Sequence, residues 1–414
     1  MKSYNISTEP KVLLLFFVFL TGLVFYAYEF FLRLLPGAYP DQIMQYFEID
    51  KFQFSFLISS YNITYLLMQI PAGILLDHFG NRRVILSAIA ICGLGNIIFI
   101  SPDYNYSVLG RLCVGFGSAF AFVAVLKLSR EYLPQKYFAT FASIAIALGT
   151  LGGAFSQQIA NVVISNDIWQ QVFIYSGFLA IPLMIFIWLV LFTNRKIGAS
   201  DYVLPPTTTV MAQVWHFIKD IRIWINALMG GLLYAPTVVL TAQWGVYYLT
   251  HSFGLSRDEA LMGVTILLLG WVVFSPLISM FADTKNMTSK IIYPFAILSL
   301  LTLWLLVYFN FGSVYTIMIL LFLFGSFSAA QVLVWRNFNK LCPNGFSGTG
   351  VAITNMMLML FVELVQLFCG YMLTESSVSN ANEFKIVILI ISLCVIMGLV
   401  MQYIFHKLTK PHRV

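Results

Sequence analysis

The chain has 414 residues, of which 60% are hydrophobic, 16% aromatic and only 10% charged, and its mean hydropathy is +0.86. Because soluble globular domains carry roughly 25% charged residues, this composition excludes a water-soluble globule. The five cysteines are odd in number and lie in apolar stretches without metal-ligand spacing. The sequence therefore predicts no disulfide framework, no metal site and no cofactor.

Twelve long apolar runs follow one another, and each approaches or exceeds the roughly 20 residues that a bilayer-spanning helix needs. The runs are continuous rather than alternating, which excludes a transmembrane β-barrel and predicts an all-α membrane protein of twelve helices in two pseudo-symmetric six-helix bundles. The first run lacks a small-residue cleavage pattern, so we expect it to stay in the mature protein. The predicted spans are residues 12–35, 52–76, 83–101, 105–128, 138–164, 169–193, 221–249, 258–282, 290–309, 314–338, 348–373 and 386–406.

Lysine and arginine are distributed unevenly over the predicted loops. With the N-terminus in the cytoplasm, 17 of the 23 basic residues fall in inside segments, 3 fall outside and 3 lie within spans. The positive-inside rule then predicts that both termini are cytoplasmic. The net charge of +6 follows from this topology and does not indicate a nucleic-acid partner.

The hydrophobic pattern is interrupted once, and residues on either side of the interruption repeat. The polar residues 195–220 predict a cytoplasmic linker between an N-terminal bundle, 1–194, and a C-terminal bundle, 221–414. A duplicated six-helix unit is typical of carriers built from repeats. The matched pairs are Tyr28 with Tyr234 and Asp77 with Asp283 at an offset of 206, and Lys127 with Arg336 and Pro134 with Pro343 at an offset of 209.

The loop after the second predicted span carries a spaced motif. It reads Gly73-Ile-Leu-Leu-Asp77-His-Phe-Gly80-Asn-Arg82-Arg83, which resembles the loop signature of the major facilitator superfamily. Gly73 permits close helix contact, and Asp77 can accept hydrogen bonds from a helix N-terminus or pair with a basic group. The alternative is a short loop that contains Gly and Arg by chance. The copy in the second half is degraded, with Ser279 in place of Gly73 and Asp283 retained.

Two further motifs match this superfamily. Arg111 begins an Arg-x-x-x-Gly pattern, and Gly149-Thr-Leu-Gly152-Gly153 resembles, without its proline, a glycine motif associated with exporters. Because small residues let helices approach closely, the glycine motif is better explained by packing than by the direction of transport.

Longer phrases are similar to a subfamily, the phagosomal nutrient transporters of intracellular bacteria such as Legionella and Francisella. These phrases begin at Tyr28-Glu29, Met68-Gln69 and Gln243-Trp244. The resemblance implies import of amino acids or nucleosides across a bacterial inner membrane. Gln243 stands where a glutamate is expected, so the resemblance carries over no role for an acid at that position.

Among the charged residues inside predicted spans of the first half, Glu29, Arg33 and Arg111 form one group. Glu29 and Arg111 are at similar depth, and Arg33 follows Glu29 by four residues, on the same helix face. Intramembrane charges are costly and mark functional sites. Burial favours a neutral Glu29 whereas the arginines favour its ionised form, so we predict a proton-coupling site of Glu29, Arg33 and Arg111 that also binds a substrate carboxylate. The alternative is a static Glu29–Arg33 bridge.

The remaining predicted residues line the substrate path or form gates. Glu363 is either a second proton site or a paired buried acid. Packing is the alternative for each of the lining residues, and positive-inside placement for the gating ones. The substrate-binding set is Tyr26, Tyr61, Asn62, Tyr65, Gln157, Tyr234, Gln243, Trp244, Asn355 and Glu363, and the gating set is Gly73, Asp77, Arg82, Arg83, Lys127, Arg130, Asp283 and Arg336.

The sequence favours a monomeric, proton-coupled importer of a small polar nutrient, with an amino acid as the favoured substrate. Two bundles would rock around a binding site at the middle of the membrane. Its partners are then a small-molecule substrate, protons and the lipid bilayer. The alternative is a proton-coupled exporter of drugs, siderophores or metabolites. An enzyme is disfavoured, because no nucleophile–base pair, metalloprotease motif, P-loop or dinucleotide motif lies in a plausible context.

Overall fold

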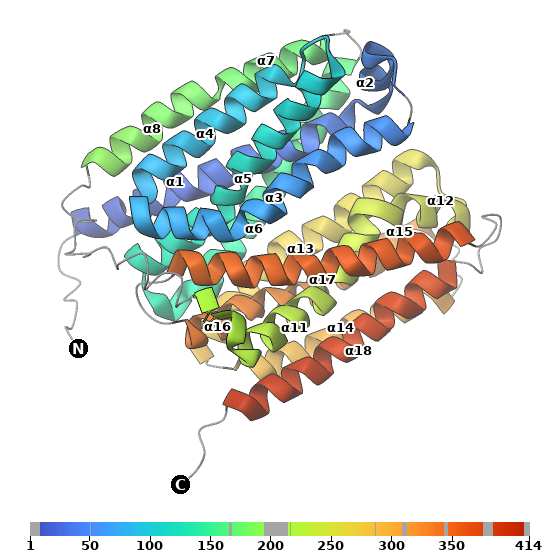
Figure 1. Ribbon diagram of the computed structural model, residues 1–414. Coiled ribbons are helices and arrows are strands. Elements are labelled where there is room, and N and C mark those ends of the chain that lie inside the picture. The colour runs from blue at the N-terminus through green and yellow to red at the C-terminus, as the bar shows by residue number, and fades with distance from the viewer. Residues whose placement is uncertain are drawn as a thin grey trace. The chain divides into compact units, whose positions relative to one another are not determined.

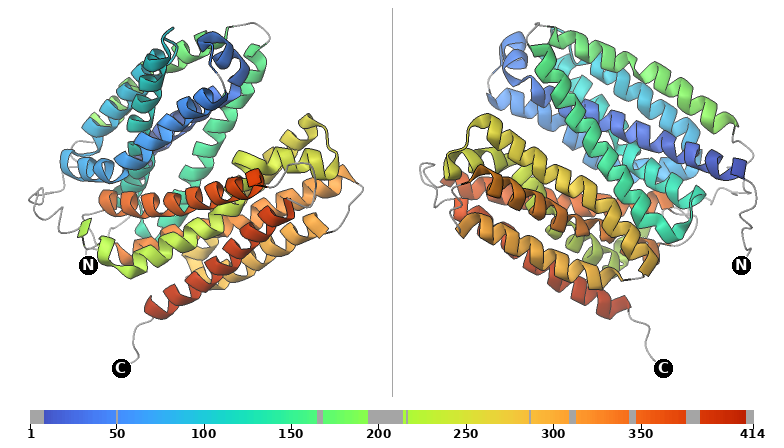
Figure 2. Two further views of the ribbon diagram at one scale, coloured as in Figure 1. Left: turned by 45° about the vertical axis from the view of Figure 1, so that its right-hand side comes forward. Right: turned by 180° about the vertical axis from the view of Figure 1, so that it is seen from behind.

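The computed structural model describes residues 9–49, 51–164, 168–193, 214–215, 217–285, 287–308, 313–342, 347–375 and 384–409. Every regular element in these residues is a helix (Figure 1). The predicted all-α class is thereby confirmed. In both views of Figure 2 the blue-to-green helices lie side by side as one bundle and the yellow-to-red helices as another.

The helices follow the predicted spans closely. Ten helices among the described residues are long and apolar enough to cross a membrane, and α3 and α6, with 29 and 27 residues, correspond to the other two predicted spans. The elements are α1 (Glu9–Leu34), η1 (Leu35–Ala38), α2 (Pro40–Phe47), α3 (Lys51–Phe79), α4 (Asn81–Ile98), α5 (Tyr104–Tyr132), η2 (Gln135–Tyr137), α6 (Phe138–Ile164), α7 (Trp169–Phe178), α8 (Ala180–Thr193), α11 (Ile221–Val238), η3 (Val239–Trp244), α12 (Gly245–Phe253), α13 (Arg257–Lys285), α14 (Thr288–Tyr308), α15 (Val314–Ser328), η4 (Ala329–Leu333), α16 (Val334–Leu341), α17 (Ser347–Glu375) and α18 (Phe384–Thr409).

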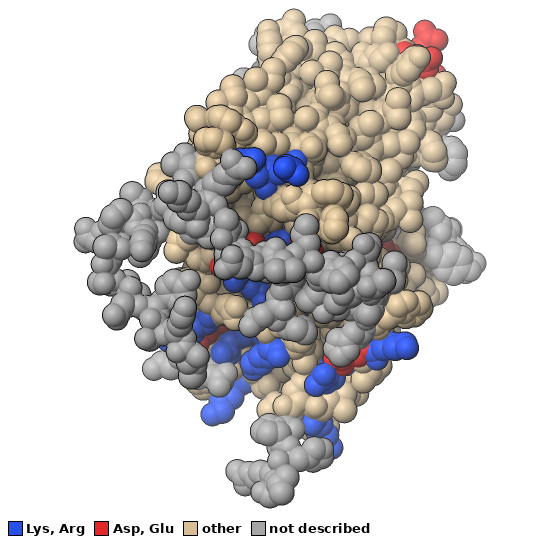
Figure 3. All heavy atoms as spheres, turned by 60° about the vertical axis from the view of Figure 1, so that its left-hand side comes forward, with Lys and Arg blue, Asp and Glu red and all other residues tan. Residues whose placement is uncertain are grey.

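The outer surfaces of the helices are apolar. Leu67 and Leu367 are 71% and 68% exposed, while polar groups such as Glu29 and Arg111 are buried. Helices satisfy their own backbone hydrogen bonds, so such surfaces are stable against lipid, where an unpaired polar group would cost several kcal/mol. On the face drawn in Figure 3, lysine and arginine side chains gather in several places, and most of the described surface between them is neither basic nor acidic.

Two of the predicted spans are interrupted in ways that hydropathy does not reveal. Span 7 is divided by a π-helical segment, η3, which begins three residues after Pro236, and span 10 contains the 3-10 segment η4. Proline lacks a backbone N–H and disrupts the regular ladder of the helix. Single-turn π-helices are frequent at functional sites.

The chain forms two compact units. Unit 1 comprises residues 1–135, 148–214 and 343–353, and unit 2 comprises residues 136–147, 215–342 and 354–414. In unit 1, α5 packs against α1, α3 and α4; in unit 2, α13 and α14 pack against α15, and α11 against α18. Each unit therefore contains a short segment, the first turns of α6 or of α17, from a helix that mostly belongs to the other. The predicted linker lies mainly outside the described residues.

Candidate functional site

The carboxyl group of Glu29 is fully buried inside unit 1. Glu29 lies on α1, and its Oε1 accepts a hydrogen bond from the hydroxyl of Tyr61 on α3. Its Oε2 has no hydrogen-bond partner among the described residues. One carboxyl oxygen is therefore bonded to Tyr61 and the other is buried without a bond.

Arg33 lies one turn beyond Glu29, and aromatic rings surround its guanidinium. The carbon Cζ is 5.4 Å from the ring centroids of Phe30, Tyr61 and Tyr65 alike. The rings of Tyr61 and Tyr65 stack at 5.8 Å with an interplanar angle of 16°. Aromatic faces attract a cation, but they leave the N–H groups of the guanidinium available to an anion.

Arg111 has a different environment. Its Nη1 and Nη2 donate to the carbonyl oxygens of Leu32 and Arg33, each at 3.3 Å. These carbonyls are in the last turn of α1, which ends at Leu34, and the last carbonyls of a helix lack intrahelical partners. Arg111 therefore caps α1, where the helix dipole also favours a cation. Its guanidinium carbon lies 4.9 Å from the Tyr61 ring centroid.

The three predicted coupling residues thus form one cluster with Tyr61 at its centre. No ion pair joins Glu29 to Arg33 or Arg111 in the described part of the chain. Tyr61 instead contacts all three side chains, Glu29 through its hydroxyl and both guanidiniums through its ring. Tyr61 contacts one carboxylate, Glu29, and two guanidiniums, Arg33 and Arg111, so the cluster contains one acidic and two basic groups.

The predicted lining residues of unit 1 have mixed environments. Tyr26 is buried and packs against Phe30 and Phe122, with ring centroids 5.0 and 5.2 Å away. Asn62 is half-buried on α3. Gln157 belongs to α6, but its side chain lies outside the described part. Tyr61 and Tyr65 are the lining residues that the structure places in the charged cluster.

The predicted lining residues of unit 2 are distributed over three elements. Tyr234 on α11 is half-buried and lies 6.0 Å from the ring of Trp271. Asn355 is buried and Glu363 half-buried on α17. Gln243 and Trp244 belong to η3, and their side chains are outside the described residues.

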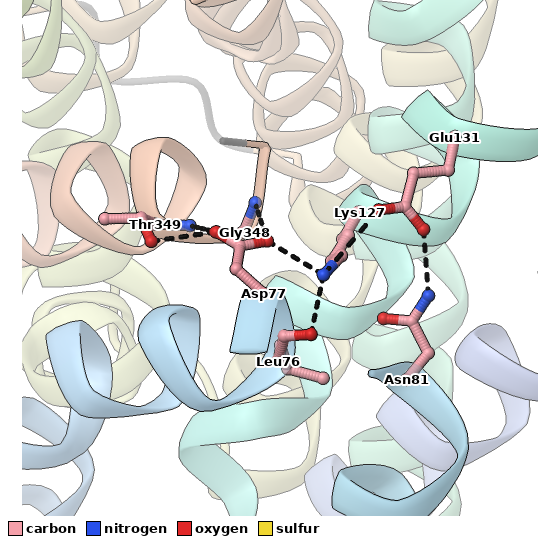
Figure 4. Close-up of polar contacts among 7 residues, drawn as sticks. All are labelled: Leu76, Asp77, Asn81, Lys127, Glu131, Gly348 and Thr349. Carbon is pink, nitrogen blue, oxygen red and sulfur yellow. Dashed lines mark hydrogen bonds and ion pairs between the residues drawn. The ribbon is translucent and has the colours of Figure 1, made fainter. Parts of the chain in front are cut away.

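The predicted gating residue Asp77 caps a helix from another part of the chain (Figure 4). Its carboxylate accepts hydrogen bonds from the backbone N–H groups of Gly348 and Thr349, at 3.3 and 2.8 Å, and from the hydroxyl of Thr349 at 2.8 Å. These donors belong to the first turn of α17, which lies in unit 1, and first-turn N–H groups lack intrahelical partners. Lys127 reaches the same carboxylate at 2.8 Å.

Lys127 is held from several sides, which offsets its burial. Its Nζ donates to the carbonyl oxygen of Leu76 at 2.6 Å and lies 3.6 Å from Glu131, and Glu131 in turn accepts from Asn81. A buried ion pair is stable only when further hydrogen bonds satisfy it, and this network supplies them. Gly73 contributes by its size, because a Cβ there would lie 2.8 Å from Gly348 O and Thr349 Cα.

Asp283 forms the corresponding cap in unit 2. Its carboxylate accepts from the backbone N–H and the hydroxyl of Thr140, at 3.0 and 2.8 Å, in the first turn of α6. Arg336 contacts the same carboxylate at 3.0 Å and donates to Thr288 at 2.8 Å. The two aspartates and two basic residues that the offsets 206 and 209 relate therefore occupy equivalent environments.

The sequence prediction omitted the two threonines of these caps. Thr140 and Thr349 are separated by 209 residues, the offset that also relates Lys127 to Arg336. The repeat was the signal that could have identified them.

Three predicted gating residues lie outside the two caps. Arg82 stacks over Phe192 at 5.7 Å, Arg83 is exposed and Arg130 is buried on α5.

The glycines of the span-5 motif have a packing explanation. A Cβ on Gly149 would lie 2.6 Å from the Tyr26 ring, one on Gly152 would overlap the carbonyl oxygen of Ala27, and one on Gly153 would meet Leu34. They allow α6 to approach α1 closely, as the packing hypothesis predicted.

Comparisons with known proteins agree with the helical architecture. The family model described as Major Facilitator Superfamily matches residues 14–365. The crystal structure of FucP, a transporter of that superfamily in the outward conformation, superimposes with a TM-score of 0.65 at 15% identity, covering 94% of this chain and 99% of that one. A bacterial homologue of the iron transporter ferroportin, in the outward-facing state, gives a TM-score of 0.73 at 14% identity over 95% of this chain and 99% of that one.

Curated relatives match over parts of the chain. The 3-(3-hydroxy-phenyl)propionate transporter of Escherichia coli (strain K12) is 25% identical over 43% of this chain and 46% of its own length, so this chain spans less than half of that relative. The hexuronate transporter of the same strain is 29% identical over 37% of this chain and 34% of its own. The galacturonate transporter of Dickeya chrysanthemi is 24% identical over 55% of this chain and 69% of its own.

Proposed function

Since the chain belongs to the Major Facilitator Superfamily, we propose that it is a proton-coupled secondary transporter that imports a small carboxylate-bearing solute by alternating access. It is a multi-pass membrane transporter and not an enzyme. The observation that carries the proposal is the cluster of Glu29, Arg33 and Arg111, in which Glu29 and Arg111 are buried and Arg33 is half-buried, with two positive charges and a single negative charge.

The excess positive charge supports an anionic substrate. Placing an ion in a low-dielectric interior costs several kcal/mol, and a cation–π contact returns only about 1–2 kcal/mol. Arg33 has such contacts and no carboxylate partner among the described residues. A substrate carboxylate that binds Arg33 bidentately would supply a compensating negative charge and accept hydrogen bonds from its N–H groups.

Proton coupling follows from the same charges. When Glu29 takes up a proton, the cluster loses its single negative charge and attracts an anion more strongly. Binding of the proton and of the carboxylate are therefore mutually favourable, and by linkage each increases the affinity for the other. A static Glu29–Arg33 bridge, the alternative interpretation, receives no support, because no ion pair joins these two side chains among the described residues.

The relatives support an organic acid more than the predicted amino acid. The three bacterial relatives reported above are named for hexuronate, galacturonate and 3-(3-hydroxy-phenyl)propionate, and each of these names denotes a carboxylate. The exporter alternative lacks a specific observation, because the glycine motif is explained by packing. The distribution of basic residues supports cytoplasmic termini. The resemblance to bacterial nutrient transporters supports an inner-membrane location, and the proposed transporter is a monomer.

The two aspartate caps act as gates in this proposal. Asp77 holds the first turn of α17, and Asp283 holds the first turn of α6. A cap of this kind joins a buried carboxylate to a helix N-terminus by several hydrogen bonds. These bonds can stabilise one conformation of the transporter and break together when it changes to the other. Alternating access then requires that these bonds break and re-form in each transport cycle.

Counterflow in proteoliposomes tests the substrate class. The panel consists of galacturonate, 3-(3-hydroxyphenyl)propionate, amino acids, nucleosides and neutral sugars, each radiolabelled. We expect exchange of a carboxylate, and loss of that exchange in Arg33→Gln. Exchange of nucleosides or neutral sugars alone would contradict the proposal, and exchange of an amino acid but of no other acid would restore the narrower prediction.

Glu29→Gln tests the coupling. Glutamine imitates the protonated acid and cannot release a proton, so we expect counterflow to persist while accumulation driven by a pH gradient falls to the level reached without a gradient. Glu259→Gln is the matched control, because Glu259 lies in the first turn of α13 and is bonded only to Ser256 among the described residues. Accumulation by Glu29→Gln at the wild-type level would remove Glu29 from the mechanism.

A further inference from the structure

Helix α13 carries three polar side chains on one buried face, which we name the α13 polar row: Trp271, Ser275 and Ser279. Their spacing of four residues places them on the same side of the helix, and they are 1%, 0% and 0% exposed. The indole Nε1 and the two hydroxyls have no hydrogen-bond partner among the described residues. Trp271 and Ser275 played no part in the site predicted from the sequence.

Several other buried hydroxyls of unit 2 donate to a carbonyl of their own helix. Ser299 donates to the carbonyl of Ala296 and Ser326 to that of Phe322, each at 2.8 Å within its own helix. The serines of the α13 polar row lack this bond, although it is open to any serine in a helix. Leaving a buried donor unpaired costs roughly 1–3 kcal/mol. Pro276 adds an acceptor nearby, because it cannot donate to the carbonyl of Val272.

The internal repeat shows what kind of group these donors suit. The offset of 206 pairs Trp271 with Tyr65, the ring that holds Arg33, and pairs Ser275 with Gln69. At the positions that correspond to the charged cluster, unit 2 has only buried apolar side chains: Ala235 for Glu29, Val239 for Arg33 and, at the offset of 209, Leu320 for Arg111. Unit 2 therefore repeats the aromatic and polar wall without its charges.

We propose that the α13 polar row is a binding subsite for the uncharged hydroxyl groups of the transported solute. Trp271 Nε1 and Ser275 Oγ hydrogen-bond these hydroxyls. The indole ring, whose centroid lies 6.0 Å from that of Tyr234, offers an apolar face to the carbon atoms that bear them. This inference rests on the proposed function and narrows it to a polyhydroxylated carboxylate, that is, a sugar acid rather than a simple fatty or amino acid.

Competition counterflow with matched solutes tests this subsite. Galacturonate and hexanoate each have six carbons and one carboxylate, but only galacturonate has hydroxyls. In Ser275→Ala and in Trp271→Phe we expect the inhibition constant of galacturonate to rise about tenfold, the equivalent of one lost hydrogen bond to a buried group, with that of hexanoate unchanged. Ser299→Ala is the matched control, since it removes a buried hydroxyl that already has its partner.

Different failures point to different parts of the argument. Equal loss for both solutes, or no change for either, would overturn the subsite while leaving the carboxylate transporter intact. Free galactose is included as a neutral probe: if the wild type exchanges it but no carboxylate, and Ser275→Ala weakens that exchange, the subsite stands and the proposed function fails. A wild type that binds none of the hydroxylated solutes would overturn the subsite. If Trp271→Phe does not fold, Ser275→Ala alone decides.

Discussion

Tyr61 contacts both the acid and the two basic groups of the cluster with one side chain. Its hydroxyl donates to Glu29, and its ring faces the guanidiniums of Arg33 and Arg111 at 5.4 and 4.9 Å. An aromatic ring attracts a cation but does not neutralise its charge. The cluster can therefore stay assembled both with and without a proton on Glu29, which a direct salt bridge would not allow.

Substituting Tyr61 by Phe separates the two functions of this side chain. Phenylalanine keeps the ring contacts to both arginines but removes the donor that favours the ionised Glu29. We expect the pH at which proton-driven uptake is half-maximal to rise by about one unit, because a hydrogen bond to a charged group contributes roughly 1.5 kcal/mol. Uptake measured from pH 5 to 9 checks this. An unchanged profile with normal transport would show that the bond does not set the proton affinity.

Helices α6 and α17 begin on carboxylates that other helices supply. Asp283 and Asp77 take the place of the N-cap residues that α6 and α17 could have used for themselves. Because free first-turn N–H groups are destabilising in a dry environment, each helix start is stable only while its aspartate is present. A threonine in each first turn strengthens the bond with its hydroxyl.

Replacing Thr349 by Val removes the hydroxyl bond to Asp77 but keeps the backbone cap. We expect a loss of roughly 1.5 kcal/mol, seen as a lower melting temperature in detergent. Thr302→Val is the control, since the Thr302 hydroxyl donates only to carbonyls of its own helix among the described residues. A double-mutant cycle with Asp77→Asn completes the test: if the Thr349 effect is as large without the carboxylate as with it, the two side chains are not coupled.

The elements differ in how far the sequence predicts them. Span positions follow from hydropathy, a local property, and α6 and α13 begin within one residue of the predicted bounds. Other features depend on which helices pack together. These are the π-helical η3, the caps by Asp77 and Asp283, and the contacts of Tyr61. Sequence could place Glu29 and Arg111 at equal depth, but only the packing of the helices brings Tyr61 of α3 into contact with both.

The whole molecule combines two units with the same framework and different chemistry. The aspartate, basic residue and threonine of each cap are retained in both. The charged cluster exists only in unit 1, since Ala235, Val239 and Leu320 occupy the matching positions of unit 2. The two units thus share the capping residues that stabilise the fold and form its gates, and they differ in the charged cluster, which unit 1 contains.

The charge of the transported complex can be predicted from this one-sided arrangement. A monocarboxylate that enters with one proton on Glu29 carries no net charge, so we expect uptake to respond to a pH gradient and not to the membrane potential. Proteoliposomes with potassium and valinomycin allow each force to be imposed separately. The initial rate should rise with an inside-alkaline gradient and stay constant under an inside-negative potential. Glu29→Gln carries the anion without a proton, so its uptake should not respond to the pH gradient and should be slowed by an inside-negative potential. Accumulation of a monocarboxylate driven by the potential alone would require at least two protons per solute, and Glu29 could then not be the only coupling group.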